Sequence, residues 1–341
     1  MKYKKILRAF LLTLFSFAFL FEAAFSSHAQ QNAPSSFTEL QDRYQLVKIP
    51  TYDGSYQVTH PKVLYFSDGW NGYQYWMSMT PYPGCADQYE NPSIVVSNDG
   101  VNWAAPEGLQ NPVAGVPGDV KKGGHYSDPH LVMCGDTMEL WYRYNPELEN
   151  ANGKRKANNS INIYYRRIST DGVHWSKPQR LMNSKDGHMS LCVNYENSLY
   201  KSWYTTYSGQ LCYSQSVDAK SWEKPVLCTV PLPEDYVPYH QDIIKNGSKY
   251  YLLQTAFKAE DYTFQLFLLT SEDGINFTDC KQVYPDHGVG LWENVSFYRS
   301  TLFFKDNQLD LYISIILPGW KWYITKSSIS LPDEYFPSCK S

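Results

Sequence analysis

The chain has 341 residues, with 30 Lys and Arg against 34 Asp and Glu, so its formal net charge is −4. This near balance, without a run of Lys or Arg, excludes an electrostatic surface built for nucleic acid. Aromatic residues make up 16% of the chain, and such side chains suit pleated sheets and flat contacts with sugar rings.

The first thirty residues have the pattern of an export signal. A basic start containing Lys2 and Arg8 precedes an apolar run from Ala9 to Phe21, and a small-x-small cleavage site follows at residues 27–29. We therefore expect residues 1–30 to be a signal peptide and the protein to be secreted or periplasmic, without a membrane span. Residues 31–341 are expected to form a single domain and a monomer.

A repeated motif, Ser-x-Asp-Gly/Ala-x-x-aromatic, organises the rest of the chain. Each copy follows a short strand-like run, and a hairpin-like pair of runs with tight-turn residues precedes that run. The four copies lie at 97–103, 169–175, 216–222 and 271–277. In such a unit the motif forms the outer turn, where its Asp and Ser are expected to bond turn amides, a structural role.

A fifth hairpin-like pair without the motif completes the pattern. Five units of this kind predict an all-β fold, a five-bladed β-propeller of four-stranded blades. Residues 31–57 are expected to complete the ring beside the last blade. The predicted blades are 58–117, 125–183, 187–230, 237–284 and 290–331.

Polar residues gather where the innermost strand of each predicted blade begins. Since these strands converge on one channel mouth, we expect the residues to share a site for a carbohydrate. The candidate catalytic residues are Asp128, Asp242 and Glu293. The candidate substrate-binding residues are His60, Glu90, His125, Arg143, His188, His240, Trp292 and Arg299.

The stretches "HPKVLYF" in the first blade and "SDPHLV" in the second give the chain a family likeness. It resembles the five-bladed propeller glycoside hydrolases of families 43, 32 and 62, which include arabinanases, β-xylosidases and invertases, and looks like an exported branch of them. The resemblance implies a base Asp in blade 1, an Asp in blade 2 that tunes pKa, and an acid Glu in blade 3. Asp128 matches the second position, but His60 and His188 stand at the other two.

The resulting prediction is a glycoside hydrolase that uses an inverting acid/base mechanism on a plant or bacterial polysaccharide or oligosaccharide. Inversion needs an acid and a base roughly 6.5–9.5 Å apart. Asp242 or Asp128 is the expected base and Glu293 the expected acid, with Glu90 in reserve. His188 or His240 is an alternative acid, because imidazole titrates near neutrality.

Other interpretations stay open. The absent blade 1 Asp and blade 3 Glu favour a propeller that binds a glycan without cleaving it. A sialidase-like enzyme is a further alternative, although the sialidase Asp box has one more residue between Asp and Gly, and so is a phosphorolytic or lyase-type sugar enzyme. The individual residues also have structural alternatives: Asp128 bonded to nearby amides, His60 and His130 as packing residues, and Arg143 paired with Glu139 or Glu147.

The sequence calls for no cofactor and no catalytic metal, although a structural cation in the channel, held by His and water, is compatible with it. The seven cysteines are odd in number and lack metal-type spacing. We expect buried thiols and one or two disulfides.

Overall fold

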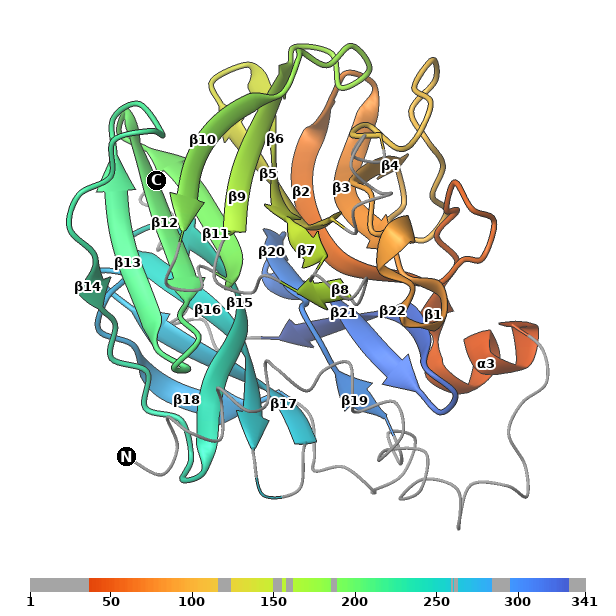
Figure 1. Cartoon of the computed structure of the whole chain (residues 1–341). Coiled ribbons are helices and arrows are strands. Elements are labelled where there is room, and N and C mark those ends of the chain that lie inside the picture. The colour runs from red at the N-terminus through yellow and green to blue at the C-terminus, as the bar shows by residue number, and fades with distance from the viewer. Residues whose placement is uncertain are drawn as a thin grey trace.

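Five antiparallel sheets stand around a common centre in the computed structural model (Figure 1). The structure describes residues 37–115, 124–149, 155–157, 162–184, 189–258, 260, 263–283 and 295–330. The arrangement confirms the predicted five-bladed β-propeller. The expected signal peptide lies outside the described residues.

Each blade is built from consecutive strands, which explains why its signals recur along the sequence. Blade 1 contains β2 (Val58–Trp70), β3 (Tyr73–Pro81) and β4 (Ser93–Ser97), and a bridge between Val96 and Ala104 marks its outer edge. Blade 2 contains β5 (His125–Cys134), β6 (Thr137–Asn145), β9 (Asn162–Ser169) and β10 (Gln179–Ser184), with a ribbon of β7 (Glu147–Glu149) and β8 (Arg155–Ala157) between β6 and β9.

The other three blades follow the same order from centre to edge. Blade 3 contains β11 (Met189–Glu196), β12 (Leu199–Thr205), β13 (Leu211–Ser216) and β14 (Val226–Leu227). Blade 4 contains β15 (Tyr236–Asn246), β16 (Lys249–Lys258), β17 (Thr263–Ser271) and β18 (Thr278–Gln282). Blade 5 contains β19 (Ser296–Phe297), β20 (Thr301–Lys305), β21 (Gln308–Leu317), β22 (Lys321–Ser330) and β1 (Leu46–Val47).

The ring of blades is closed in two ways: by contacts between the inner strands and by the pairing of the N-terminal strand with the last blade. The inner strands contact one another in the cyclic order β2, β5, β11, β15 and β20, and β20 returns to β2. The lead-in joins the last blade as expected, because β1 pairs with β22 and places Leu46 opposite Thr325. Before it, the short helix α3 (Phe37–Tyr44), which the sequence pattern does not predict, buries Leu40 and Tyr44, one turn apart, in the core of blade 5.

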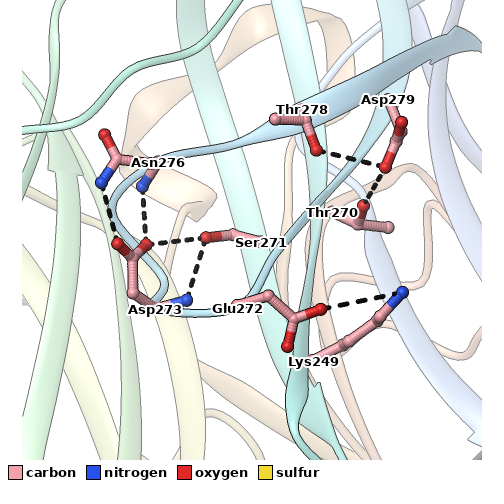
Figure 2. A pocket seen from close by; sticks show the side chains of 8 residues that line it. All are labelled: Lys249, Thr270, Ser271, Glu272, Asp273, Asn276, Thr278 and Asp279. Atoms are coloured by element: carbon pink, nitrogen blue, oxygen red, sulfur yellow. Dashed lines mark hydrogen bonds and ion pairs between the residues drawn. The ribbon is translucent and has the colours of Figure 1, made fainter.

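The repeated motif forms the outer turns, as predicted. In the first copy the Asp99 carboxylate accepts the amides of Val101 and Asn102, and the Ser97 hydroxyl accepts the amide of Gly100. These amide donors hold the pKa of Asp99 well below its usual range. Figure 2 shows the equivalent turn of blade 4, where a small pocket is lined by polar groups that bond one another, including Asp273 with Asn276. The motif is therefore structural.

The expectation of disulfides is wrong for the six cysteines that the structure describes, since all of them are free thiols. Among them, Cys134 donates to the Tyr200 hydroxyl, whereas Cys192 donates to Asp242. Cys339 lies outside the described residues. No helix in the described part of the chain is long and apolar enough to cross a membrane.

Candidate functional site

Three of the five inner strands share a backbone irregularity at the point where each enters the channel. The register of β2, β5 and β11 with its neighbour shifts here, and His60, Asp128 and Ser190 adopt φ values of 56°, 52° and 52°. Non-glycine residues seldom adopt positive φ, and strained positions of this kind cluster at functional sites. In each blade this residue and the residue two positions later are polar and buried, which creates two layers.

We call the layers the upper tier and the lower tier. The upper tier consists of His60, Asp128, Ser190, His240 and Arg299. The lower tier consists of Lys62, His130, Cys192, Asp242 and Thr301. All ten side chains belong to buried residues, so each charge among them needs a partner.

In the lower tier, the Asp242 carboxylate is the common acceptor. Lys62 Nζ lies 2.8 Å from Oδ1 and 3.0 Å from Oδ2, and the Thr301 hydroxyl lies 2.6 Å from Oδ2. Burial alone would raise the pKa of Asp242, but Lys62 and the hydrogen bonds lower it. Lys62 and Asp242 of the lower tier thus form a buried ion pair in the interior of the channel.

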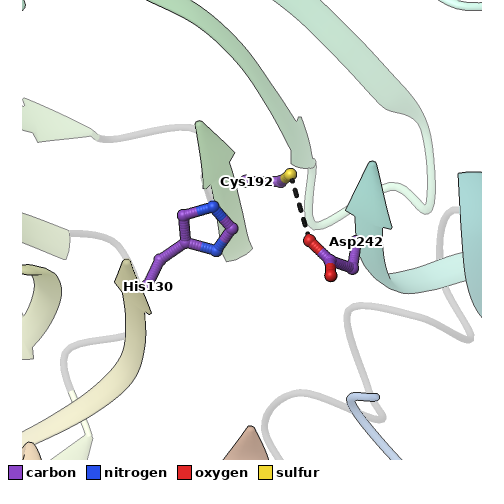
Figure 3. A group of neighbouring side chains, drawn as sticks. All are labelled: His130, Cys192 and Asp242. Atoms are coloured by element: carbon purple, nitrogen blue, oxygen red, sulfur yellow. Dashed lines mark hydrogen bonds between the residues drawn. The ribbon is translucent and has the colours of Figure 1, made fainter. Parts of the chain in front are cut away.

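His130, Cys192 and Asp242 lie close enough together to suggest a metal site, as Figure 3 shows. Their atoms are already engaged, however: the Val193 amide donates to His130 Nε2 at 3.1 Å, and the Lys62 ammonium occupies Asp242. The Lys62 ammonium group therefore already supplies the positive charge beside this cluster. A metal ion would have to displace the ammonium group from Asp242.

In the upper tier, Asp128 is in contact with two arginines and with the imidazole of His60. Arg143 Nε lies 2.9 Å from Oδ2, Arg299 Nη1 lies 3.2 Å from Oδ1, and His60 Nε2 lies 3.5 Å from Oδ1. Burial would raise the pKa of Asp128, but Arg143, His60 and Arg299 outweigh it and hold the pKa well below its usual range. Asp128 is consequently ionised and a weak base. The ion pairs of Asp128 rule out the alternative that it only bonds nearby amides. Arg143 does not pair with Glu139, because Glu139 pairs with Arg166.

Glu90 has the opposite environment. It follows η1 (Pro83–Cys85) and η2 (Asp87–Tyr89) in the loop between β3 and β4, which directs its buried side chain toward the upper tier. Its carboxyl group lies 3.3 Å from His60 Nδ1, 3.7 Å from His125 Nε2 and 3.2 Å from the Ser127 hydroxyl. Burial raises the pKa of Glu90 well above its usual range. This carboxyl group can therefore carry a proton near neutral pH.

The imidazoles of His60 and His240 are neutral. Burial lowers the pKa of His60 to about 3, despite the nearby Asp128 carboxylate. Burial also lowers the pKa of His240 well below its usual range. His240 Nδ1 contacts the Ser190 hydroxyl, and among the described residues Nε2 is a buried atom without a hydrogen-bond partner.

The rim of the site is formed by the least buried members of the cluster. The side chain of Arg143 is 16% exposed and that of His125 is 12% exposed, against 1% for Asp128. Arg143 Nη1 also contacts Asn162, whose amide bonds the Tyr207 hydroxyl. Arg143 and His125 are therefore the most solvent-accessible side chains of these ion pairs.

The structure brings together most of the predicted site residues. His60, Glu90, Arg143 and Arg299 lie within contact distance of Asp128 or of each other, His125 contacts Glu90, and His240 occupies the same tier. Asp242 lies one layer deeper, paired with Lys62. Glu293, Trp292 and His188 fall outside the described residues.

Sequence reasoning missed Ser190 and Lys62. The position in blade 3 that corresponds to Asp128 is occupied by Ser190, because β11 begins at Met189 and its register shift spans Ser190. A recurring pair of polar residues two positions apart at the start of an apolar run was the available signal: "HPK", "DPH", "SLC", "HQD" and "RST". Lys62 escaped notice because a lysine within an apolar strand looks like a surface residue.

Glu90, the reserve acid, and Asp128 are not arranged as the acid/base pair of an inverting glycosidase, whereas Glu293, the expected acid, lies outside the described residues. The imidazole of His60 stands between Glu90 and Asp128, with one ring nitrogen toward each carboxyl group. A sugar ring and a water molecule cannot occupy the same space, so these two residues do not form an acid/base pair across a glycosidic bond. The site holds a buried carboxyl group of raised pKa, the neutral imidazoles of His60 and His240, and the guanidinium groups of Arg143 and Arg299.

These features define a five-bladed propeller with the fold of carbohydrate-active enzymes. No family model matches the chain. It is 27% identical over 303 residues to the A type blood N-acetyl-α-D-galactosamine deacetylase of Flavonifractor plautii, with 73% of this chain and 38% of that protein covered. The chain therefore spans well under half the length of this curated relative.

Solved structures agree on the fold. The N-acetylgalactosamine deacetylase from F. plautii, determined with blood group B trisaccharide, superposes with a TM-score of 0.70 at 23% identity and covers 84% of this chain and 94% of its own. The family 43 protein BlXynB from Bacillus licheniformis gives 0.57 at 12% identity, covering 82% and 53%. An exo-1,5-α-L-arabinanase from a bovine ruminal metagenomic library gives 0.56 at 12% identity, covering 82% and 94%. The resemblance to propeller glycoside hydrolases is thus confirmed as a likeness of fold.

Proposed function

We propose that this protein is a hydrolase that removes the acetyl group from an N-acetylated sugar of a glycan. The observation that carries the proposal is the upper tier with Glu90 and Arg143 beside it, where a buried carboxyl group of raised pKa lies next to neutral imidazoles and two arginines. The sequence similarity to a deacetylase supports it, since that relative acts on an acetamido sugar.

Amide hydrolysis requires three groups that the site can provide. A base must take a proton from water, a donor must stabilise the oxyanion, and an acid must protonate the leaving amine. His240 Nε2 is neutral and free to accept a proton, and the nearby Asp128 carboxylate stabilises the resulting imidazolium. Arg143 at the rim faces the oxyanion, and Glu90 supplies the proton to the amine. Water and the amide become acetate and a free amino sugar.

The assay separates this reaction from its competitors. An oligosaccharide ending in N-acetylgalactosamine or N-acetylglucosamine is incubated with the protein, and acetate, free amine and reducing ends are measured. We expect acetate and amine in equal amounts and no new reducing ends; the matched glycan with a hydroxyl in place of the acetamido group should not react. Reducing ends without acetate would identify a glycosidase, and binding without release a glycan-binding protein.

The assay is also run with and without a chelator, because Asp128 and His240 resemble cation ligands. Both Asp128 oxygens make ion pairs but no well-directed hydrogen bond, and His240 Nε2 has no partner among the described residues. Carboxylate oxygen and imidazole nitrogen are common ligands of divalent cations. Activity lost on chelation and restored by a divalent ion would mean that these two residues act as ligands.

Glu90 is expected to control the alkaline limb of the rate. Replacing Glu90 with Gln should lower kcat/KM by about 100-fold, the ordinary contribution of a general acid. Because the acid form is required, the wild-type rate should fall as pH rises through the raised pKa of Glu90, and the residual rate of the variant should lack this decline. Glu107→Gln, at an exposed position of the same blade, is the matched control. An unchanged alkaline limb in Glu90→Gln would remove Glu90 from this role.

We also propose that the protein is exported and acts on glycans outside the cytoplasm. The basic, apolar and small-residue segments within residues 1–30 support this. N-terminal sequencing of protein expressed in a secreting host should find Gln30 or Gln31 as the first residue. A mature chain that retains Met1 would contradict export by this signal.

A further inference from the structure

In the upper tier, the side chains of Ser190 and His240 join blade 3 to blade 4. Among the described residues, this is the one side-chain contact between these two blades in that tier. The Ser190 hydroxyl contacts His240 Nδ1, and both residues are buried. The neighbouring residue adds a second link between the blades, because the side-chain amide of Gln241 donates to the Ser190 carbonyl at 2.5 Å. The His240 imidazole itself contacts Ser190 through one bond, between Nδ1 and the hydroxyl.

The plane of the His240 ring is set by aromatic neighbours. Tyr239 and Tyr298 pack edge-on against it, each with ring centroids 4.3 Å from the imidazole centroid. The ring cannot turn without displacing these two side chains. With the orientation of the ring fixed, the remaining question is which of its two nitrogens carries the single proton of the neutral imidazole.

The surroundings of Nε2 decide this variable. If Nε2 carried the proton, a buried N–H donor would face no acceptor among the described residues. An unsatisfied donor is a rarer and costlier defect in proteins than an acceptor with a free lone pair. In the opposite tautomer the proton is on Nδ1. The Nδ1–H group then donates a hydrogen bond to the Ser190 hydroxyl oxygen, and the lone pair of Nε2 stays available.

We propose that Ser190 is a positioning residue that holds His240 as the Nδ1–H tautomer and so presents the Nε2 lone pair to the reacting group. This inference rests on the proposed function, in which Nε2 accepts the proton from water. Ser190 touches neither substrate nor water in this scheme and acts through His240. It also explains why a non-glycine residue is kept at a φ of 52°, since this backbone directs the hydroxyl across the channel.

The test combines a tautomer measurement with kinetics. Protein labelled with ¹⁵N at histidine is examined by long-range ¹H–¹⁵N NMR, which distinguishes protonated from bare ring nitrogens, and His240→Gln identifies the His240 signals. In the wild type we expect a protonated Nδ1 and a bare Nε2. In Ser190→Ala the proton should move partly or wholly to Nε2, and kcat/KM should fall by roughly 10- to 100-fold, mostly through kcat.

Two further variants keep the result interpretable. Ser190→Gly also removes the hydroxyl but tolerates positive φ, so it replaces Ser190→Ala if that variant does not fold. Ser202→Ala removes a buried hydroxyl from β12 of the same blade, where it donates to the Ser214 carbonyl, and should change neither the tautomer nor the rate.

A wild-type Nε2–H signal, or a Ser190→Ala protein with unchanged tautomer and rate, would overturn the inference. The proposed function fails separately: if the wild type releases no acetate but the tautomer still depends on Ser190, the positioning role stands and the assigned reaction does not.

Discussion

Replacing Asp128 with Asn should lower kcat/KM by about 100-fold or more and reduce the free energy of unfolding by about 3 kcal/mol. The carboxylate is almost completely buried and is the only counter-charge within ion-pair distance of Arg299 among the described residues. An amide cannot neutralise Arg143 and Arg299, so both guanidinium groups would remain charged and incompletely paired. Breaking a buried pair in this way is far more costly than losing a surface one.

The two effects have different origins and are measured separately. Denaturant unfolding followed by tryptophan fluorescence reports the stability, whereas acetate release at a temperature where both proteins are folded reports the rate. Asp136→Asn, in the exposed turn between β5 and β6 of the same blade, should change neither quantity by more than about 0.5 kcal/mol. An Asp128→Asn enzyme with full activity would show that the carboxylate does not support the reacting groups.

Replacing Lys62 with Met should cost about 3–5 kcal/mol of stability and leave substrate chemistry intact in the protein that remains folded. The ammonium group is the cation that neutralises Asp242 in the lower tier, and no solvent reaches the pair. Without it, Asp242 becomes a buried charge held only by neutral donors such as the Thr301 hydroxyl. The destabilisation comes from the unpaired Asp242 carboxylate that remains buried, rather than from the lost attraction between Lys62 and Asp242.

A double-mutant cycle tests this reasoning. Asp242→Leu alone should be similarly destabilising, since it leaves the ammonium unpaired, but Lys62→Met combined with Asp242→Leu should cost much less than the sum of the two. The pH dependence provides a second check. Because the pKa of Asp242 is lowered by folding, its contribution to stability is present above the unfolded pKa and lost as pH falls through the folded pKa. The double variant should lack this loss, and additive costs in the cycle would contradict the ion-pair assignment.

The glycosidase expected from the sequence and the deacetylase proposed from the structure share most of their residues. Asp128, Glu90, His60 and Arg143 were all recognisable as a cluster from their places at blade entries and loops. Their roles were not, because a role depends on which group contacts which. Burial raises the pKa of Glu90, whereas Arg143 and Arg299 outweigh burial and lower the pKa of Asp128, and the His60 ring lies between the two carboxyl groups.

The amino-acid sequence by itself determined the propeller and its five blades. A repeat of strands and Asp-Gly turns is local information, since each turn is bonded within a few residues and each hairpin within one blade. It also determined that titratable residues meet at one end of the inner strands, because all blades are built in the same direction.

Only the tertiary structure decided the two tiers and the state of each charge. That Asp242 is the partner of Lys62, and that Ser190 of blade 3 contacts His240, depends on strand register and on residues 180 and 50 positions away in the chain. Protonation depends on burial and on the distances to charges from other blades, and neither quantity is encoded within any single strand.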